Sequence, residues 1–438
     1  MIIAGRRRPA VTLVPISPLG YSDSMVRFLA LCLAGVFLVL GCAGKTGTSR
    51  VPEKEAPGET GDRGEAAGEE PVFAAYREQA ARIVSSLDDY YLASQVLMTG
   101  IDNKPLLSEP MKALLRDHPP GGIMLFKYNL NTGKEEVRSF LGECSALVSA
   151  ALPVASLETG PWSILPFLAV DHEGGLVHRF GPGVEKLPEP ALYWEMARIE
   201  GREAALEAIE AGALRSGREI RDLGITMNFA PVAEILTGDN RPFLETRSYG
   251  PDGAFVEAAA AAFIRGMDAA GIACVVKHFP GNSGADPHAG RVVLGADREG
   301  LDRMIRPFAA LAGLKPPAIM VSHVVVPAWD GERNASLSPE IIQRRLREDL
   351  GFTGIVLGDD YAMGAIALSG LGVEDAVVAA LNAGVDMVMT WPGNLRAIHG
   401  AILRALGEGR LERDRLRDAA ERILAEKIRY GLVREGEK

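Results

Sequence analysis

The sequence predicts an α/β protein, a single-domain (β/α)₈ TIM-type barrel that follows an N-terminal segment of a different kind. From about residue 71 onward, eight short apolar or β-branched runs alternate with longer segments of helical periodicity. The runs are apolar throughout instead of alternating with polar residues, which is typical of parallel strands covered on the outside. Eight such strands with crossover helices favour a barrel. A doubly wound open sheet is the alternative, but no Gly-x-Gly-x-x-Gly turn follows an early strand.

The elements follow from these patterns in chain order. The expected strands lie at residues 97–101, 121–126, 167–173, 225–232, 272–279, 318–324, 354–360 and 386–391. The clearest helical segments between and after them lie at residues 192–222, 253–270, 339–350, 373–383 and 396–428. The connection after the first strand has the weakest helical pattern. Gly351 and Gly384 stand where two of these helices should end, because glycine accepts the left-handed conformation of a helix C-terminus.

Composition excludes several classes of protein. Among 438 residues, 47% are hydrophobic and 24% are charged, which matches a globular chain and excludes a disordered, collagenous or multi-span membrane protein. The net charge of −10 argues against a nucleic-acid partner. Four cysteines in a chain of this length do not form a disulfide framework. Cys274 lies inside an apolar strand pattern, so we expect it to be a small core residue.

The N-terminal residues 1–41 are expected to form a signal peptide. The apolar run at residues 28–40 would span only about 20 Å as a helix, which is too short for a comfortable transmembrane segment. Arg27 precedes the run and small residues follow it, as in a secretory signal. Residues 1–24 make an unusual start for such a signal, so Met25 is the better candidate for the true initiator. The alternative to a lipoprotein signal is a plain signal peptide, or a buried N-terminal helix with an incidental Cys42.

The run ends in Val39-Leu40-Gly41-Cys42, which resembles the lipobox of bacterial lipoproteins, and this implies that Cys42 is lipidated. Residues 42–70 then form an acidic linker, with seven acidic and two basic residues between Val51 and Glu70 and no large aromatic side chain. Such a segment buries too little apolar surface to fold by itself. We therefore expect a barrel domain at 71–438, tethered to a membrane by its lipid and located in the cell envelope.

Polar side chains gather at the ends of the expected strands, where a (β/α)₈ barrel builds its active site. Six strand ends carry charged, imidazole, amide or aromatic groups: Asp171-His172-Glu173, Asn228, Lys277-His278, Ser322-His323, Asp359-Asp360 and Trp391. A single polar strand end has little meaning, but six predict a polar pocket. We expect His323 to be a hydrogen-bonded wall residue. Trp391 fits either a platform for a sugar or a residue that closes the barrel.

Three chemistries are compatible with such a pocket. Metal-dependent hydrolysis is disfavoured, because the seven histidines are dispersed and the first strand carries none, and we expect no metal. A Schiff-base lyase would need a desolvated lysine, and Lys277 has a suitable position. A glycosidase would need a nucleophilic carboxylate and a proton donor, for which Asp359 and the Asp286-Pro287-His288 segment qualify. In that segment Asp286 would orient the imidazole of His288 for proton transfer.

The motifs then point to one family. The segments LAVDHEGGLVHRF, NFAPVAEI, RSYG, KHFPG and SLSP–GFTGIVLGDDYAM follow one another as in family-3 glycoside hydrolases, and GGIMLF precedes them. The resemblance covers residues 90–430 and is greatest to the single-barrel bacterial β-N-acetylglucosaminidase branch, because no second domain follows the barrel. KHFPG followed closely by Asp-x-His is typical of that branch.

The resemblance implies a role for each matching residue. Asp359 corresponds to the catalytic nucleophile, and Asp360 is the alternative. His288 corresponds to the acid/base, with Asp286 as its carboxylate partner. The remaining matched positions would hold the hydroxyl groups and N-acetyl group of the sugar, and they are Asp171, Arg179, Arg247, Lys277 and His278.

The sequence departs from the family pattern mainly around the acid/base segment. The family reads Pro-Gly-His-Gly where this chain has Pro280-Gly281-Asn282-Ser283, and the segment to Asp286 is about two residues shorter. Glu234 stands where the family has Asp. Other departures are Leu176 for Arg, His172 and His178 for Gln, Pro287 for Ser or Thr, and Gly358 for Ser or Thr. The nucleophile, the Asp-x-His pair and the sugar contacts are retained.

The expected function is therefore that of a retaining exo-β-N-acetylhexosaminidase. It would release terminal N-acetylglucosamine from β-glycosides, with peptidoglycan fragments as the leading substrate, without a cofactor and as a monomer. Two alternatives stay open. One is a catalytically silent sugar-binding lipoprotein, motivated by the remodelled segment, and the other is a β-glycosidase or phosphorylase with a different sugar specificity.

Overall fold

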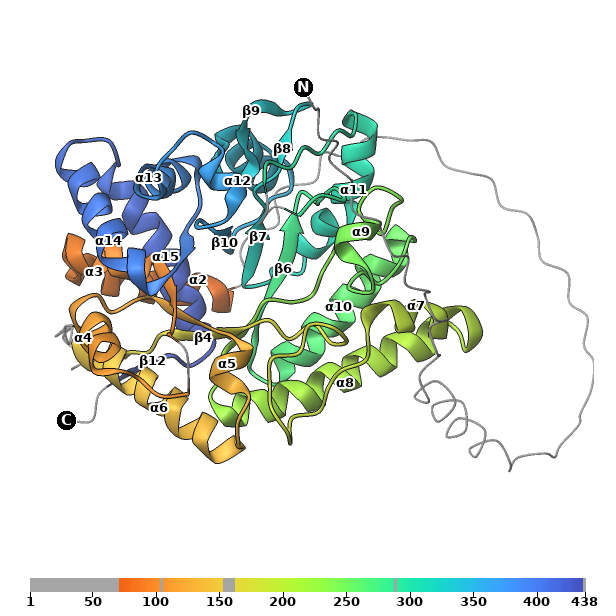
Figure 1. The fold of residues 1–438 in the computed structure, drawn as a ribbon, viewed down its shortest axis with the longest axis horizontal. Coiled ribbons are helices and arrows are strands. Elements are labelled where there is room, and N and C mark those ends of the chain that lie inside the picture. The colour runs from red at the N-terminus through yellow and green to blue at the C-terminus, as the bar shows by residue number, and fades with distance from the viewer. Residues whose placement is uncertain (1–70, 103–104, 153–161, 287–289, 436–438) are drawn as a thin grey trace, which may run out of the picture. The chain divides into compact units, whose positions relative to one another are not determined.

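The computed structural model describes residues 71–102, 105–152, 162–286 and 290–435, and these contain a closed parallel barrel (Figure 1). The strands pair in the order β1-β11-β10-β7-β6-β5-β4-β2, and β1 also pairs with β2 to close the ring. Each expected strand segment contains one of them, so the predicted fold class is confirmed. The barrel strands are β1 (Leu97–Gly100), β2 (Gly122–Leu125), β4 (Phe167–Val170), β5 (Met227–Asn228), β6 (Ala273–Phe279), β7 (Ala318–Val321), β10 (Ile355–Asp360) and β11 (Met387–Thr390).

Helices cover the outside of the strands, as Figure 1 shows. In the first half of the barrel they are α2 (Pro71–Ser86), α3 (Asp89–Gln95), α4 (Glu109–Asp117), α5 (Lys127–Leu130), α6 (Lys134–Ala151), α7 (Pro190–Ile199), α8 (Arg202–Leu223), α9 (Arg241–Leu244) and α10 (Gly253–Ala269). In the second half they are α11 (Arg298–Ala312), η1 (Ala335–Leu337), η2 (Glu340–Asp349), α12 (Gly364–Ala367), α13 (Val373–Ala383), α14 (Pro392–Gly407) and α15 (Arg413–Arg429).

Two segments that were predicted to be single continuous helices are each divided into two helices, so these two predictions were wrong. The segment at 192–222 is divided between α7 and α8, which are separated at Gly201, a residue with φ of 104°. The segment at 396–428 is divided between α14 and α15, and the connection contains Gly409 with φ of 69°. Glycine adopts such angles without steric cost, so the chain changes direction there although the apolar periodicity continues on both sides. Gly384 ends α13 with φ of 111°, as predicted.

Two small antiparallel sheets lie outside the barrel. β3 (Trp162–Ile164) pairs with β12 (Val433–Glu435), which joins the end of the described chain to the segment before β4. β8 (Val325–Val326) pairs with β9 (Asp330–Asn334) in the connection after β7. The sequence analysis predicted neither, because runs of two to five residues carry too little periodicity to be recognised.

The core agrees with the expected role of the cysteines. Cys274 is 1% exposed and Cys144 is fully buried. Burial raises the pKa of Cys144 to about 12, so this thiol stays protonated and unreactive at neutral pH.

A buried ion cluster fixes the end of the barrel opposite the strand C-termini. Asp386, immediately before β11, is fully buried. Its Oδ2 accepts hydrogen bonds from Arg347 Nη2 at 2.5 Å and from the Val356 backbone N–H at 2.8 Å. Its Oδ1 accepts from Arg415 Nη2 at 2.8 Å, and Arg422 Nη1 lies 3.4 Å away. One carboxylate thus connects η2 and α15 to the barrel.

Replacing Asp386 with Ala is expected to lower the free energy of unfolding by about 3–5 kcal/mol, because it leaves buried guanidinium groups without a counter-charge. Burial by itself would raise the pKa of Asp386, but the three arginines lower it below its usual range. The stabilisation is therefore present above the unfolded pKa of about 3.9 and is lost as the pH falls toward the folded pKa. Denaturant titrations at several pH values measure this. Asp414→Ala, at a side chain that is 97% exposed, is the control, and an equal effect of the two changes would contradict the prediction.

Residues 1–70, which include the expected signal peptide, Cys42 and the linker, lie outside the described residues, so those assignments stay predictions. Over the ranges given above, none of the helices has both the length and the apolar character needed to span a bilayer.

Candidate active site

A cavity of about 310 Å³ opens at the C-terminal ends of the barrel strands. Six of the eight residues predicted for catalysis or sugar binding line it, which are Asp171, Arg179, Arg247, Lys277, His278 and Asp359. Asp286 is exposed on the segment after β6 and does not line it. His288 lies outside the described residues, so its pairing with Asp286 stays a prediction.

One wall of the cavity is a network of ion pairs centred on Glu173. The two carboxylate oxygens of Glu173 accept hydrogen bonds from Arg247 Nε and Nη2, each at 2.8 Å. Lys277 Nζ lies 2.6 Å from Glu173 Oε1 and 2.7 Å from Asp171 Oδ1. Arg179 Nη2 approaches Asp171 Oδ2 at 3.5 Å. The network holds Lys277 and Arg247 in fixed positions while they line the cavity.

Glu173 is 4% exposed and remains ionised. Burial alone would raise the pKa of Glu173, but the charges of Lys277 and Arg247 outweigh it and hold that pKa well below its usual range. From the sequence, Glu173 is expected at a strand end but has no predicted role. Its spacing of two residues from Asp171 was the available signal, since residues two apart in an extended segment point to the same side.

At the end of β10, Asp359 and Asp360 occupy different environments. Burial would raise the pKa of Asp359, but His323 and His278 lower it below its usual value, so Asp359 is a carboxylate at neutral pH. Burial raises the pKa of Asp360 above its usual value. Neighbouring acids whose pKa values are moved apart are typical of active sites that assign them different tasks.

The hydrogen bonds of Asp360 show what it does. Its Oδ2 accepts from Trp391 Nε1 at 2.7 Å, and its Oδ1 accepts from the Ala362 backbone N–H at 2.8 Å. Both oxygens are therefore engaged within the protein. Asp359 Oδ1 accepts only from the Asp360 backbone N–H, at 2.8 Å, among the contacts of the described residues. Of the two acids, Asp359 is the one whose carboxylate is available to a ligand.

Two histidines near the cavity hold structure in place. His323 is buried, with Nδ1 2.6 Å from Ser336 Oγ and Nε2 3.0 Å from the Asp360 carbonyl oxygen. It is hydrogen-bonded as expected, but it is not among the residues that line the cavity. His172 is fully buried and does not line the cavity; its Nε2 lies 2.7 Å from Ser216 Oγ. Burial lowers the pKa of His172 to about 3, so this ring is neutral.

Two aromatic side chains that line the cavity come from the strands on either side of β1. Trp391 follows β11 and stacks on Phe126, which follows β2, with ring centroids 5.0 Å apart. A Cβ atom at Gly100, the last residue of β1, would lie 3.1 Å from the indole ring, so glycine leaves the space that Trp391 occupies. Trp391 therefore lines the cavity and packs against its rim, and its role as a platform for a sugar stays a prediction.

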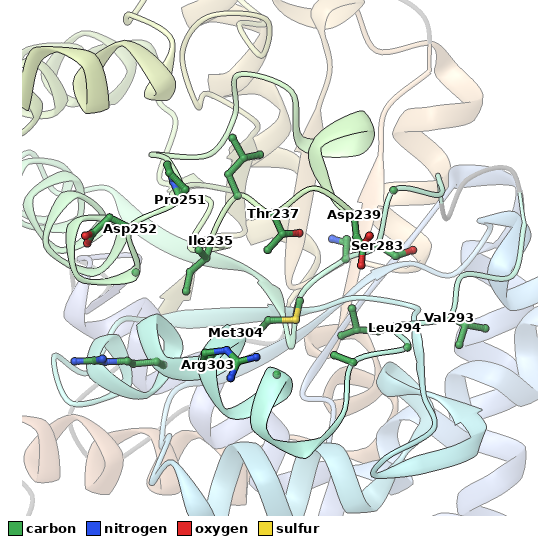
Figure 2. Close-up of a pocket in the computed structure, with 18 of the residues that line it drawn as sticks. Ile235, Thr237, Asp239, Pro251, Asp252, Ser283, Val293, Leu294, Arg303 and Met304 are labelled. Carbon is green, nitrogen blue, oxygen red and sulfur yellow. The ribbon is translucent and has the colours of Figure 1, made fainter. Parts of the chain in front are cut away.

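A second, larger cavity of about 930 Å³ lies beside the first (Figure 2). The segments after β5 and β6 and the first turns of α10 and α11 line it, and Thr237, Asp239, Ser283 and Arg303 are among the side chains drawn in Figure 2. Asn282 lines both cavities. Across the ranges that the structure describes, no group of three or more His, Cys, Asp or Glu side chains is arranged to hold a metal ion.

Comparison with known proteins agrees with this geometry. The sequence profile described as "Glycosyl hydrolase family 3 N terminal domain" matches residues 94–425. A protein of Methylococcus capsulatus named "Beta-hexosaminidase" is 32% identical over 348 residues, which are 73% of this chain and 96% of that protein. A second protein with that name, from Stenotrophomonas maltophilia, is 33% identical over 342 residues, which are 73% of this chain and 94% of that protein.

Solved structures give the same result. A family 3 β-N-acetylglucosaminidase from Paenibacillus sp. str. FPU-7 superposes with a TM-score of 0.71 at 30% identity, over 79% of this chain and 63% of that one. A family 3 glycosyl hydrolase from Mycobacterium smegmatis has a TM-score of 0.66 at 30% identity, over 78% of this chain and 98% of that one. The barrel, its strand-end site and these similarities together show that the chain belongs to glycoside hydrolase family 3 and is a glycoside hydrolase.

Proposed function

We propose that this protein is a retaining exo-β-N-acetylhexosaminidase that releases terminal N-acetylglucosamine from β-glycosides. The observation that carries the proposal is the placement of the ionised Asp359 in a cavity of about 310 Å³ together with Lys277, Arg247 and His278. The cavity pairs a carboxylate with donors for hydroxyl and amide oxygens. The names of the two β-hexosaminidases and of the Paenibacillus enzyme support the choice of sugar.

In the proposed reaction Asp359 is the nucleophile. A carboxylate oxygen of Asp359 attacks the anomeric carbon, the bond from that carbon to the leaving oxygen breaks, and His288 donates a proton to that oxygen. Water then attacks the glycosyl-aspartate as His288 takes its proton, which frees the sugar and restores the Asp359 carboxylate. Asp286 would orient the imidazole of His288.

The remaining predicted residues bind the terminal sugar in this proposal. Lys277, Arg247 and Arg179 supply N–H donors to its oxygens, and Asp171 and His278 Nε2 accept from hydroxyl groups. Since Asp171 and Lys277 are already held by their ion pairs, little reorganisation is needed when the sugar binds.

Replacing Lys277 with Met is expected to lower kcat/KM by about 30-fold or more, because it removes a donor and leaves the buried Glu173 and Asp171 without a shared cation. Steady-state kinetics on an aryl β-N-acetylglucosaminide measure the loss. Lys112→Met, which removes only ion pairs with Glu109 and Glu143, is the matched control. If kcat/KM is the same in both variants, Lys277 has no part in binding.

The experiment that tests the activity compares an aryl β-N-acetylglucosaminide with an aryl β-glucoside, each with and without phosphate. The proposal expects faster hydrolysis of the first substrate and no dependence on phosphate. A preference for the glucoside would reassign the sugar, and a sugar phosphate product would make the protein a phosphorylase.

A second candidate is a sugar-binding protein without turnover. The observation that favours it is that Asp286 is exposed and is not among the residues that line the cavity. Binding of N-acetylglucosamine by a purified protein that never releases the aryl alcohol would support this candidate.

We also propose that the enzyme acts in the cell envelope, anchored through a lipid on Cys42, and that peptidoglycan fragments are its substrates. The lipobox resemblance at residues 39–42 supports the anchor. Replacing Cys42 with Ala should move the protein from the membrane fraction to the soluble fraction of the envelope, and an unchanged distribution would contradict the anchor.

A further inference from the structure

Glu234 is a buried carboxylate hydrogen-bonded to Asn282, the residue that lines both cavities. Glu234 follows β5 and is 2% exposed. Its Oε1 lies 2.6 Å from His278 Nδ1, and its Oε2 accepts a hydrogen bond from the Asn282 backbone N–H at 2.6 Å. The side-chain amide of Asn282 donates to Oε1 as well, at 3.1 Å. Three donors thus converge on one carboxylate.

The contact with Glu234 fixes the direction of the His278 ring. A carboxylate oxygen accepts hydrogen bonds, so Nδ1 is the ring nitrogen that donates to Glu234. The ring is thereby held in one orientation while it lines the sugar cavity. A carboxylate behind a functional imidazole commonly fixes its tautomer and direction in this way.

Glu234 also holds the segment that leads to the proposed acid/base pair. Asn282 is 1% exposed and begins that segment four residues before Asp286. On the other side, the backbone carbonyl oxygen of Glu234 accepts from Ser248 Oγ at 2.7 Å, and Ser248 adjoins Arg247 of the cavity wall. A single residue therefore contacts the sugar-binding histidine, the root of the acid/base segment and the Arg247 segment.

We propose that Glu234 is a positioning residue that couples the sugar cavity to the acid/base segment, and that Asn282 is its matched partner. The inference rests on the proposed function, because it concerns how that site is assembled. The Glu234 side chain is long and the Asn282 side chain is short, and the two meet at 3.1 Å. A shorter acid paired with a longer donor, Asp with His, should therefore span a similar distance.

The test is a double-mutant cycle with E234D, N282H and E234D/N282H, assayed on aryl β-N-acetylglucosaminides with leaving groups of increasing pKa. E234D withdraws the carboxylate from both partners. We expect KM to rise for all substrates, because His278 is no longer held in the sugar cavity. We also expect kcat to fall by about 10²-fold, but only for substrates with poor leaving groups. This loss is part of the rate enhancement that general acid catalysis supplies. In the double variant, kcat for poor leaving groups should be at least about 10-fold higher than in E234D. The effects of two substitutions are not additive when the residues are in contact.

Two further variants separate positioning from stability. Asn282→Ala removes only the side-chain amide and keeps the backbone contact, so it should fold and lose about 10-fold on poor leaving groups. Lys427→Met disrupts a buried polar pair with Gln95 before β1, at the other end of the barrel. It should lower the melting temperature without changing the dependence on the leaving group. The inference is overturned if the Glu234 variants lower only the melting temperature, as Lys427→Met does. It is also overturned if the loss of kcat in the double variant equals the product of the losses in the two single variants.

A binding measurement distinguishes this inference from the proposed function. If the wild-type protein releases no aryl alcohol, the proposed function fails, but calorimetric binding of N-acetylglucosamine still reports on His278. E234D should then weaken binding by about 10-fold. Unchanged affinity overturns the role of Glu234, and a wild-type protein that neither binds nor hydrolyses overturns both.

Discussion

Replacing Asp359 with Ala is expected to lower kcat by about 10⁴-fold or more on every β-glycoside that the wild-type protein hydrolyses. The glycosyl-enzyme cannot form without this carboxylate, and the neighbouring Asp360 has both oxygens engaged by Trp391 and Ala362. The loss should not depend on the leaving group, because attack on the anomeric carbon is needed for all of them. Pre-steady-state kinetics with substrate in excess and an activated aryl glycoside measure it, since no burst of aryl alcohol should precede the steady state.

Asp360→Asn is the matched control, because it keeps the shape of the side chain next to the proposed nucleophile. We expect a loss of less than about 10²-fold, from disturbing Trp391 and not from removing the reacting group. The reverse result, with a severe loss in Asp360→Asn and an active Asp359→Ala, would make Asp360 the nucleophile.

Replacing His288 with Ala should give a loss that depends on the leaving group. General acid–base catalysis typically contributes about 10²–10⁴-fold, and a poor leaving group needs the full contribution. An activated aryl leaving group departs without protonation, so its first step should change little. The second step still lacks a base, and added azide should accelerate it and yield a glycosyl azide, because azide needs no proton removed. Product analysis with and without azide checks this.

For poor leaving groups, the activity of Asp286→Asn should lie between that of the wild-type protein and that of His288→Ala. This variant keeps the imidazole but holds it less firmly in its orientation. If His288→Ala lowers the activity equally for all leaving groups and azide has no effect, the acid/base is another residue. In that case the buried pair of Glu234 and His278, which adjoins Asp359, would be the next candidate.

The sequence predicted the barrel because a parallel sheet that is covered by helices must be apolar on both faces. That requirement leaves eight apolar runs, and each contains a barrel strand. The same reasoning predicted Asp171, Lys277 and Asp359 as neighbours, since parallel strands bring their C-terminal ends to one rim. Periodicity did not locate the breaks at Gly201 and Gly409, because the apolar pattern is the same on both sides of each turn.

Only the tertiary structure determines which polar groups are in contact with one another. Glu173 and Glu234 lie in the segments LAVDHEGGLVHRF and NFAPVAEI without a role that the sequence predicts, yet both are buried and hold cations or donors that line the cavity. Asp359 and Asp360 are adjacent in sequence and chemically identical, and only their surroundings separate an available carboxylate from one that is engaged on both oxygens. Hydrogen-bond partners and desolvation depend on contacts between residues far apart in the sequence, such as Asp171 and Lys277, which are separated by 106 positions. A local pattern places a residue at a strand end, but its ionisation and its free oxygens depend on those distant contacts.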